Sequence, residues 1–332
     1  MENIFLGALE DNRSEEAKSK DYFFNEIVAT ANPVNWVEKP ESQWRTFPVQ
    51  NQNGSGSCVA QTARKLLRVL FHNICGKDID FSASHIYQRR SNKPQGGMIG
   101  VDAMEILRQG TSLNALMQSD NMNDMQMDGI PETDFDRKIG DTFKISNYVQ
   151  LAPKSFDEVA SVIQTTGKAV MVWFFFTPAE WSKLIPTIDN PNLTVAQGAR
   201  HSTSAVDITL KNGKEYIIIE DSAHFGGLSR RLISREFFNA RNFFCAYPMN
   251  FKYTESEVPV AKITKTLKLG MTDPEVKILQ DILKAKGYYA TNIDSTGYFG
   301  GVTLRAVKDF QTAYNLEADG VVGPLTRAII NK

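Results

Sequence analysis

The sequence predicts an α+β domain followed by a small all-α domain of three helices. The chain has 332 residues, more than one hydrophobic core usually contains. Its first part begins with helical patterns and becomes strand-rich after residue 168, an order typical of α+β folds. The predicted boundaries are an N-terminal extension over 1–40, the α+β domain over 41–252, a linker over 253–265 and the helical domain over 266–332.

Composition and charge describe an ordinary globular protein. Hydrophobic residues make up 42% of the chain, charged residues make up 23%, and the formal net charge is -1. This balance gives no long-range attraction to nucleic acid or to an anionic membrane, so we expect neither as a partner. Three cysteines are too few for a disulfide scaffold and fit a reducing site of synthesis.

The N-terminus predicts synthesis in the cytoplasm without a signal peptide. It lacks the basic start and the long apolar core that such a peptide needs. The longest apolar run, over 169–176, has the length of a buried strand and not of a membrane span. We expect the chain to act as a monomer.

Helical periodicity marks three segments of the α+β domain. Apolar residues recur at helical spacing over 57–73, where Ser57 is the expected N-cap. Further helices are expected over 101–109 and over 155–166. The stretch 111–145 is rich in Met, Asp and Asn and is expected to be an irregular surface excursion.

Strand patterns dominate the second half of the domain, while residues 1–40 are expected to form an extended arm. Runs rich in Val, Ile and aromatic residues predict strands over 168–176, 201–210, 214–221 and 243–249. Asn212 and Gly213 lie between two of these runs and form a strong hairpin turn signal.

The clearest chemical signal is the segment 52–58, which reads QNGSGSC and leads directly into the first helix. A thiolate is the nucleophilic form of cysteine, and the unpaired N–H groups of a helix N-terminus favour negative charge. The glycines let backbone amides approach a reacting carbonyl, and the Gln52 amide is placed to stabilise a developing oxyanion. Cys58 is therefore a candidate nucleophile that needs a base.

Among the four histidines, His201 is the best-placed base. It opens the strand over 201–210, where a side chain can face a cleft. Asp221 ends the next strand and is placed to orient the imidazole. A cysteine at a helix start, with a histidine and a carboxylate on paired strands, is the arrangement that a thiol peptidase requires.

These segments resemble the papain family of cysteine peptidases over roughly 40–250. Gln52 and Cys58 match the family's oxyanion glutamine and nucleophile, and His201 follows at about the expected distance. The run IIIEDSAHFGG resembles the family's strand that ends in Asn-Ser-Trp-Gly. The resemblance implies a papain-like two-lobed domain, with a helical lobe and a β-barrel-like lobe, in which Asp221 completes the catalytic set.

A fourth segment, QGGMIGVDAMEILRQG, resembles the part of the family that lines the substrate cleft. The resemblance implies that Gly96 and Gly97 bind substrate, although the pair also fits a simple turn. Two departures stand out. Asp221 replaces an asparagine, and Ala223 replaces the tryptophan that shields it, so we expect greater water access to this contact.

Other readings of the candidate residues remain open. His224 is a competing base, and Cys58 alone fits a small buried residue. Cys75 and Cys245 are expected to be free and buried. The chain contains neither a CxxC pair nor an HExxH motif, so we expect no metal and no cofactor.

The C-terminal segment 266–332 shows three helical patterns separated by glycine-rich turns. Their expected core residues are Val276, Leu279, Leu283, Val307, Phe310, Leu316 and Ile329. It resembles the peptidoglycan-binding-1 domain family at VKILQ, LKAKGYY, GYFGGVTLRAVKDFQ and DGVVGPLT. The resemblance implies a non-catalytic three-helix unit that binds bacterial peptidoglycan, against the alternative of a general protein-interaction bundle. Tyr298, Phe299 and Thr303 are candidates for its ligand groove, and Phe299 fits a core position equally well.

Together the two resemblances predict a thiol endopeptidase tethered to its polymer, which hydrolyses amide bonds in wall peptides. The lack of a signal peptide and of a family-length pro-segment suggests a phage endolysin released on lysis. Two alternatives remain: a wall-anchored peptidase of protein substrates, and a non-enzymatic wall-binding protein on a degenerate peptidase scaffold.

Overall fold

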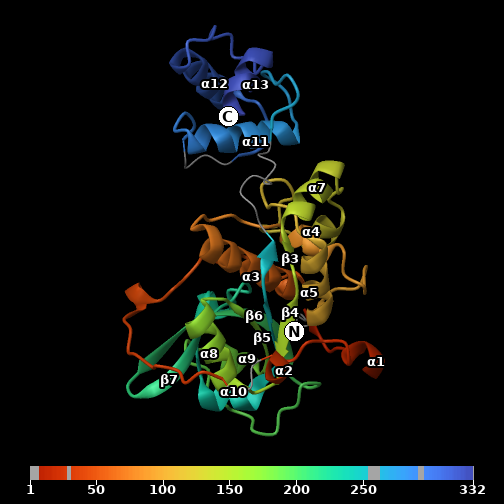
Figure 1. Cartoon of the computed structure of the whole chain (residues 1–332), viewed down its shortest axis with the longest axis vertical. Helices are drawn as coiled ribbons and strands as arrows, with labels where there is room; N and C mark the ends of the chain where they lie inside the picture. The colour runs from red at the N-terminus through yellow and green to blue at the C-terminus, as the bar shows by residue number, and fades with distance from the viewer. Residues whose placement is uncertain (1–6, 28–30, 253–261, 291–294, 332) are drawn as a thin grey trace. The chain divides into compact units, whose positions relative to one another are not determined.

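The computed structural model describes residues 7–27, 31–252, 262–290 and 295–331 (Figure 1). The chain forms two compact units, Met1–Tyr253 and Thr254–Lys332. Most of the predicted linker, residues 253–261, lies outside the described residues. Over the described ranges, none of the helices combines the length and the apolar character that crossing a membrane requires.

The centre of the first unit is a six-stranded sheet in the order β4-β9-β5-β6-β7-β8. Its strands are β4 (Tyr148–Leu151), β5 (Val170–Phe176), β6 (Ala199–Lys211), β7 (Lys214–Glu220), β8 (Arg230–Ser234) and β9 (Asn242–Pro248). All neighbouring pairs are antiparallel. The sheet is open, with β4 and β8 at its edges, so the expected barrel-like closure is wrong although the α+β class is confirmed.

The four predicted strands correspond to β5, β6, β7 and β9. Asn212 and Gly213 join β6 to β7 with φ angles of 52° and 71°. Both residues occupy the left-handed region that a two-residue hairpin turn of type I′ requires, which asparagine and glycine tolerate best. The turn sets the register that later brings His201 and Asp221 together.

The predicted helices correspond to α3 (Cys58–Cys75), α5 (Gly100–Gln109) and α8 (Phe156–Thr166). Further short helices are α1 (Glu15–Lys18), α2 (Phe24–Ile27), α4 (Ala83–Tyr87), α6 (Asp124–Asp128), α7 (Asp134–Thr142), α9 (Pro178–Trp181) and α10 (Arg235–Arg241). Helix α3 packs on β6, and α5 packs on β9. The start of α3 is thereby held against the sheet.

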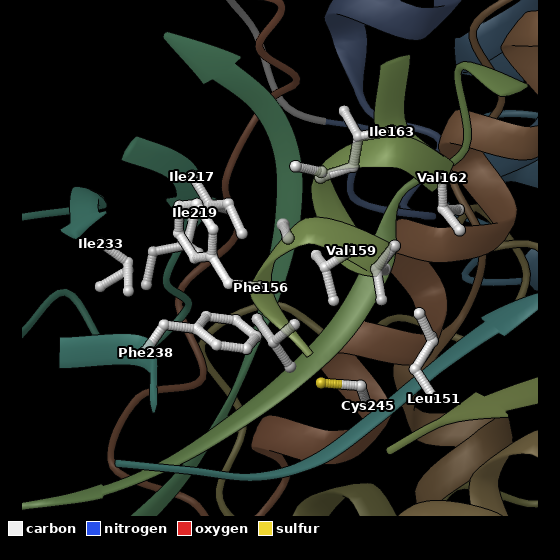
Figure 2. Close-up of a cluster of buried hydrophobic side chains, with 14 of the residues drawn as sticks. Leu151, Phe156, Val159, Val162, Ile163, Ile217, Ile219, Ile233, Phe238 and Cys245 are labelled. Carbon is white, nitrogen blue, oxygen red and sulfur yellow. The ribbon is translucent and has the colours of Figure 1, made fainter. Parts of the chain in front are cut away.

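The face of the sheet beneath α8 contains a large apolar cluster (Figure 2). Phe156, Val159 and Ile163 of α8 face Ile217 and Ile219 of β7, and all five side chains are buried. Alternate residues of a strand point to opposite faces, so the other face of the same strands is available for α3. Burial of this cluster is the main stabilising contribution in this half of the unit.

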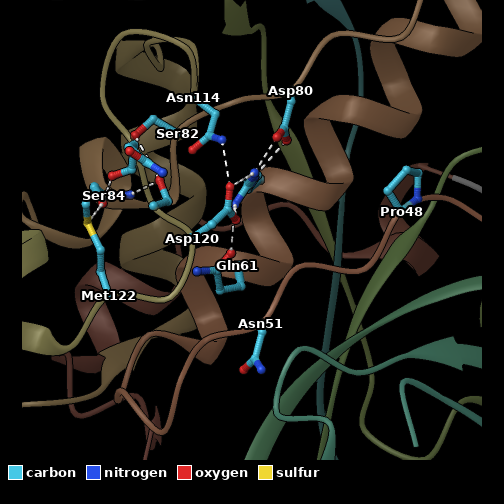
Figure 3. Close-up of polar contacts among 12 residues, drawn as sticks. Pro48, Asn51, Gln61, Asp80, Ser82, Ser84, Asn114, Asp120 and Met122 are labelled. Atoms are coloured by element: carbon cyan, nitrogen blue, oxygen red, sulfur yellow. Dashed lines mark hydrogen bonds and ion pairs between the residues drawn. The ribbon is translucent and has the colours of Figure 1, made fainter. Parts of the chain in front are cut away.

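The stretch 111–145 is more regular than predicted. Helices α6 and α7 each begin with a capping box, in which Asn123 and Gln126, or Thr133 and Asp136, bond each other's backbone. A buried arginine of α3, Arg64, ties the excursion to the main body through bonds to Asp120 and Asp80 (Figure 3). Local capping thus compensates for the weak apolar pattern of the segment.

Over its described residues, 7–27 and 31–40, the N-terminal segment packs on the rest of the first unit and does not form an extended arm. Strand β1 (Ala8–Leu9) pairs in parallel with β2 (Met98–Ile99). Phe24 belongs to the apolar cluster beneath α8, and its neighbour Phe23 bridges to Gln150 of β4. Apolar residues within the polar segment therefore anchor it.

The C-terminal unit contains α11 (Pro274–Ala285), α12 (Gly301–Ala313) and α13 (Pro324–Ile330), as predicted. Five of the predicted core residues are fully buried: Val276, Leu279, Leu283, Val307 and Phe310. Leu316 and Ile329 are only half-buried, and Ile330 takes the core position expected for Ile329. The buried face of the short last helix is therefore displaced by one residue from the predicted face.

Candidate active site

Cys58 is the first residue of α3, directly after the loop that the glycines of QNGSGSC form. Its side chain is only 1% exposed. The N-cap Ser57 makes no side-chain capping bond, because its hydroxyl pairs with that of Ser55 at 2.6 Å. The sulfur therefore lies at a helix N-terminus, where backbone N–H groups favour an anion.

His201 and Asp221 meet at the end of the β6–β7 hairpin. The imidazole Nε2 lies 2.7 Å from Asp221 Oδ1, and both residues are fully buried. Burial by itself lowers the pKa of His201, but the charge and hydrogen bond of Asp221, with those of Cys58, raise it to about 10. His201, rather than His224, is thus the histidine that joins the cysteine to the carboxylate.

The carboxylate of Asp221 has four donors. Its Oδ1 accepts from His201 Nε2 and from the Ala223 amide at 2.8 Å. Its Oδ2 accepts from Trp181 Nε1 at 2.8 Å and from the Arg231 guanidinium. Burial raises the pKa of Asp221, but the charge of His201, its hydrogen bond and the charge of Arg231 outweigh burial and lower the pKa.

Trp181 and Arg231 are site residues that the sequence did not reveal. The Trp181 indole is fully buried, stacks on Phe176 at 4.2 Å and presents an edge-to-face contact to His201. The expectation that Ala223 exposes the contact to water is therefore wrong, because Trp181 shields it from another segment. The one available signal was indirect: a buried carboxylate without its own shield requires partners.

Gln52 is buried beside the same constellation. Its Oε1 accepts from the Ser222 hydroxyl at 2.8 Å, and its backbone N–H donates to the Ser222 carbonyl at 3.0 Å. Its Nε2 donates to the Ser55 carbonyl at 2.9 Å. These bonds hold the loop before Cys58 against the residue that follows Asp221.

Gly96 and Gly97 lie close to the same loop. The Gly97 N–H donates to the Tyr87 hydroxyl at 3.0 Å, and a Cβ added to Gly56 would lie 2.6 Å from the Gly97 nitrogen. Gly56 therefore has no room for a side chain beside the Gly97 backbone. Both glycines directly precede β2, whose partner is β1.

The N-terminal strap, which we define as residues 7–10, covers Cys58. A Cβ added to Gly7 would lie 2.5 Å from Cys58 Sγ and 2.7 Å from the Gly56 carbonyl oxygen. The Gly7 carbonyl accepts from Met98 N at 2.8 Å, and Ala8 is fully buried. The backbone of the strap therefore lies directly against the thiol and contributes to its burial.

The remaining cysteines lie away from this group. Cys245 of β9 is buried in the apolar cluster, as expected (Figure 2). Cys75 ends α3 and is partly exposed, so the expectation that it is buried is wrong. Burial raises the pKa of the Cys245 thiol well above its ordinary value, so this residue is suited to packing.

In the C-terminal unit, Tyr298 is 50% exposed while Phe299 and Thr303 are buried. Phe299 packs in the core, and the Thr303 hydroxyl accepts from Gln280 Nε2 at 2.9 Å. Gln280 Nε2 also donates to the Tyr298 carbonyl, and Gln280 Oε1 accepts from the Gly297 N–H. Tyr298 is therefore the one of the three candidates that faces solvent.

Comparison with known proteins identifies the C-terminal unit. Residues 272–330 match the peptidoglycan binding domain family PG_binding_1. A protein of Kitasatospora aureofaciens is 48% identical over 54 residues, which are 16% of this chain and 44% of that protein. The match thus spans less than half of that relative.

The first unit resembles solved cysteine proteases in fold. Xylellain from Xylella fastidiosa superposes with a TM-score of 0.56 at 15% identity, over 75% of this chain and 96% of that one. Procathepsin L2 from Tenebrio molitor gives a TM-score of 0.58 at 17% identity, over 74% and 79% of the two chains. The chain therefore joins a domain with the papain-like cysteine protease fold to a C-terminal domain of the peptidoglycan-binding family.

Proposed function

We propose that the chain is an endolysin-like cysteine endopeptidase that hydrolyses amide bonds in the peptides of bacterial peptidoglycan. The observation that carries the proposal is the contact of His201 with both Cys58 and Asp221 in a chain that also holds a peptidoglycan-binding domain. The wall domain brings the peptidase to its substrate and raises the local substrate concentration.

The chemistry begins with the thiolate of Cys58 and the imidazolium of His201. The sulfur attacks the carbonyl carbon of the scissile amide, and the oxyanion accepts hydrogen bonds from the Cys58 amide and from Gln52. His201 then gives its proton to the leaving amine, and the C–N bond breaks. A water molecule attacks the thioester, His201 takes a proton from it, and the C–S bond breaks to release the acid.

Gln52 suits its proposed role because its amide is already fixed. Its Nε2 carries two hydrogens, of which one is used on the Ser55 carbonyl. The second remains for an oxyanion beside Cys58. A donor that is held before substrate arrives stabilises developing charge without reorganisation. Gly96 and Gly97 are the proposed backbone edge on which the peptide lies once the N-terminal strap has left.

The test is the digestion of purified peptidoglycan followed by mass spectrometry of the released muropeptides. We expect new free amino groups and shortened stem or cross-bridge peptides with the wild type, and none with Cys58→Ala. Because the N-terminal strap covers Cys58, a chain that begins at Glu10 is assayed beside the full chain. Intact muropeptides alongside cleavage of a protein substrate would instead identify a wall-anchored protease.

Wall binding is expected to depend on Tyr298. Its ring is half exposed, and its backbone carbonyl is held by Gln280, so Tyr298→Ala removes a surface ring without disturbing the loop. Loss of an aromatic contact typically costs about 1–2 kcal/mol, or roughly a tenfold weaker association. Sedimentation with purified peptidoglycan measures it.

The matched control is Tyr314→Ala, which removes another exposed tyrosine just after the end of α12. We expect Tyr314→Ala to sediment with peptidoglycan as the wild type does. Equal sedimentation of Tyr298→Ala and the wild type would remove Tyr298 from the proposed ligand surface.

A further inference from the structure

Arg231 of β8 is fully buried beneath the candidate active site, and each of its nitrogens has a partner. Its Nε donates to the Trp181 carbonyl at 2.8 Å, its Nη2 donates to the Phe225 carbonyl at 2.8 Å, and its Nη1 bonds Asp221. The guanidinium also lies 4.7 Å from the centre of the Trp181 ring. These contacts fix the planar guanidinium in one orientation, with Nη1 directed at the Asp221 carboxylate.

The charges around this carboxylate come from few groups. Asp221 faces His201 of β6 and Arg231 of β8, and His201 also faces Cys58 of α3. Trp181 and the Ala223 amide contribute neutral donors. The nearby buried carboxylate of Glu180, which precedes Trp181, is itself paired with Arg241.

We propose that Arg231 is a positioning residue whose charge offsets that of Asp221, so that the carboxylate orients His201 without trapping the proton that the reaction moves. The inference rests on the thiol chemistry of the proposed function. A neutral side-chain amide orients an imidazole without adding charge. Asp221 adds a full negative charge in a buried site, and Arg231 returns the pair to neutrality.

The physical reason is the low dielectric of a buried site, where a charge within a few ångströms acts strongly. Without Arg231, the thiolate, the carboxylate and the imidazolium together would carry a net negative charge. Each acid in the group would then release its proton at higher pH. Without the charge of Asp221, the reverse holds, and each acid would release its proton at lower pH.

The experiment measures how fast iodoacetamide alkylates Cys58 as a function of pH, with mass spectrometry of the Cys58 peptide. Alkylation requires no peptide substrate, so it separates this inference from the proposed function. The acid limb of the profile reports formation of the thiolate–imidazolium pair, and the basic limb reports loss of the imidazolium proton. If Cys58 of the chain that begins at Glu10 never reacts above the rate of a free thiol, that result would count against the proposed function instead.

Four variants separate the effect of the Arg231 charge from that of the Asp221 charge. Arg231→Met is expected to move both limbs up by roughly one pH unit, and Asp221→Asn is expected to move them down by about one to three units. The double variant is expected to lie between Asp221→Asn and the wild type. Arg231→Lys keeps the charge, so both limbs are expected to stay at the wild-type pH. It loses the guanidinium bonds to the Trp181 and Phe225 carbonyls. A purely structural arginine would leave the limbs unmoved when Arg231→Met is made, either alone or in addition to Asp221→Asn.

Arg231→Met leaves Asp221 with one charged partner fewer, so it is checked for folding by circular dichroism. Should it fail to fold, the comparison of Asp221→Asn with the double variant still decides the question. Compensation predicts that adding Arg231→Met to Asp221→Asn moves the limbs up. Limbs that do not move, or that move down, overturn the proposal.

Discussion

Removal of residues 1–9 is expected to increase the rate of Cys58 alkylation at neutral pH on the order of a hundredfold. In the closed state the Gly7 backbone lies on the thiol, and β1 occupies the edge of β2. We therefore expect substrate or reagent to reach Cys58 only after the N-terminal strap leaves. A closed state favoured by about 3 kcal/mol leaves roughly one molecule in a hundred open, which sets the expected gain.

A single methyl group tests the same contact without shortening the chain. Gly7→Ala places a Cβ against both the sulfur and the Gly56 carbonyl, and backbone atoms there have little room to yield. Overpacking of this kind costs about 1–3 kcal/mol, so we expect a gain of roughly five- to a hundredfold in alkylation rate. Peptidase activity should rise in parallel if the open form is the active one.

The control is Glu10→Gln, which keeps the backbone of the N-terminal strap unchanged. Glu10 lies 3.7 Å from Arg200 and is mostly exposed, so loss of this ion pair is expected to change the rate less than threefold. Equal alkylation rates for the full chain and the shortened chain would show that the strap does not protect Cys58 in solution.

Much of the architecture is readable from local patterns. The hairpin at Asn212 and Gly213 follows from the left-handed conformation that these two residues tolerate, and α3 and α8 follow from apolar periodicity. Because a helix start and a strand end are local features, the sequence alone marks Cys58, His201 and Asp221 as candidates. The structure brings the three side chains together.

What escaped prediction depends on contacts between distant segments. Trp181 lies 40 positions before Asp221 in sequence, and only the packing of α9 against the sheet brings its indole to the carboxylate. Arg231 has no local pattern that marks a buried arginine. The docking of Gly7 on Cys58 likewise joins residues that are far apart in sequence. The periodicity of a short sequence segment carries no information about contacts between residues that are distant in sequence.

Two further differences from the prediction, the open sheet and the helices within 111–145, also depend on contacts that the sequence pattern does not show. A series of predicted strands does not indicate whether the first and last strands of the sheet pair to close a barrel. Here the edge strands β4 and β8 do not pair. Helices α6 and α7 have weak apolar patterns, and their capping boxes are short signals that the bulk composition of the segment obscured. The boundaries of short elements are set by such individual bonds.

Trp181→Ala is expected to lower the free energy of unfolding by about 3–5 kcal/mol, the largest loss of stability among the substitutions considered. The indole is fully buried, stacks on Phe176 and supplies a hydrogen bond to Asp221. Trp181→Phe keeps most of the stacking and removes only the donor, which is expected to cost about 1–3 kcal/mol. Denaturant titration followed by circular dichroism measures both variants.

The matched control is Trp44→Phe, because the Trp44 indole also donates a hydrogen bond, to the Lys39 carbonyl at 3.2 Å, but is only half-buried. Water can replace that donor, so we expect a loss below about 1 kcal/mol. The difference between the two Trp→Phe changes isolates the cost of leaving a buried carboxylate short of one partner. If Trp181→Phe proves as mild as Trp44→Phe, the carboxylate is held by Arg231, His201 and the Ala223 amide alone, and the indole acts only as a hydrophobic cover.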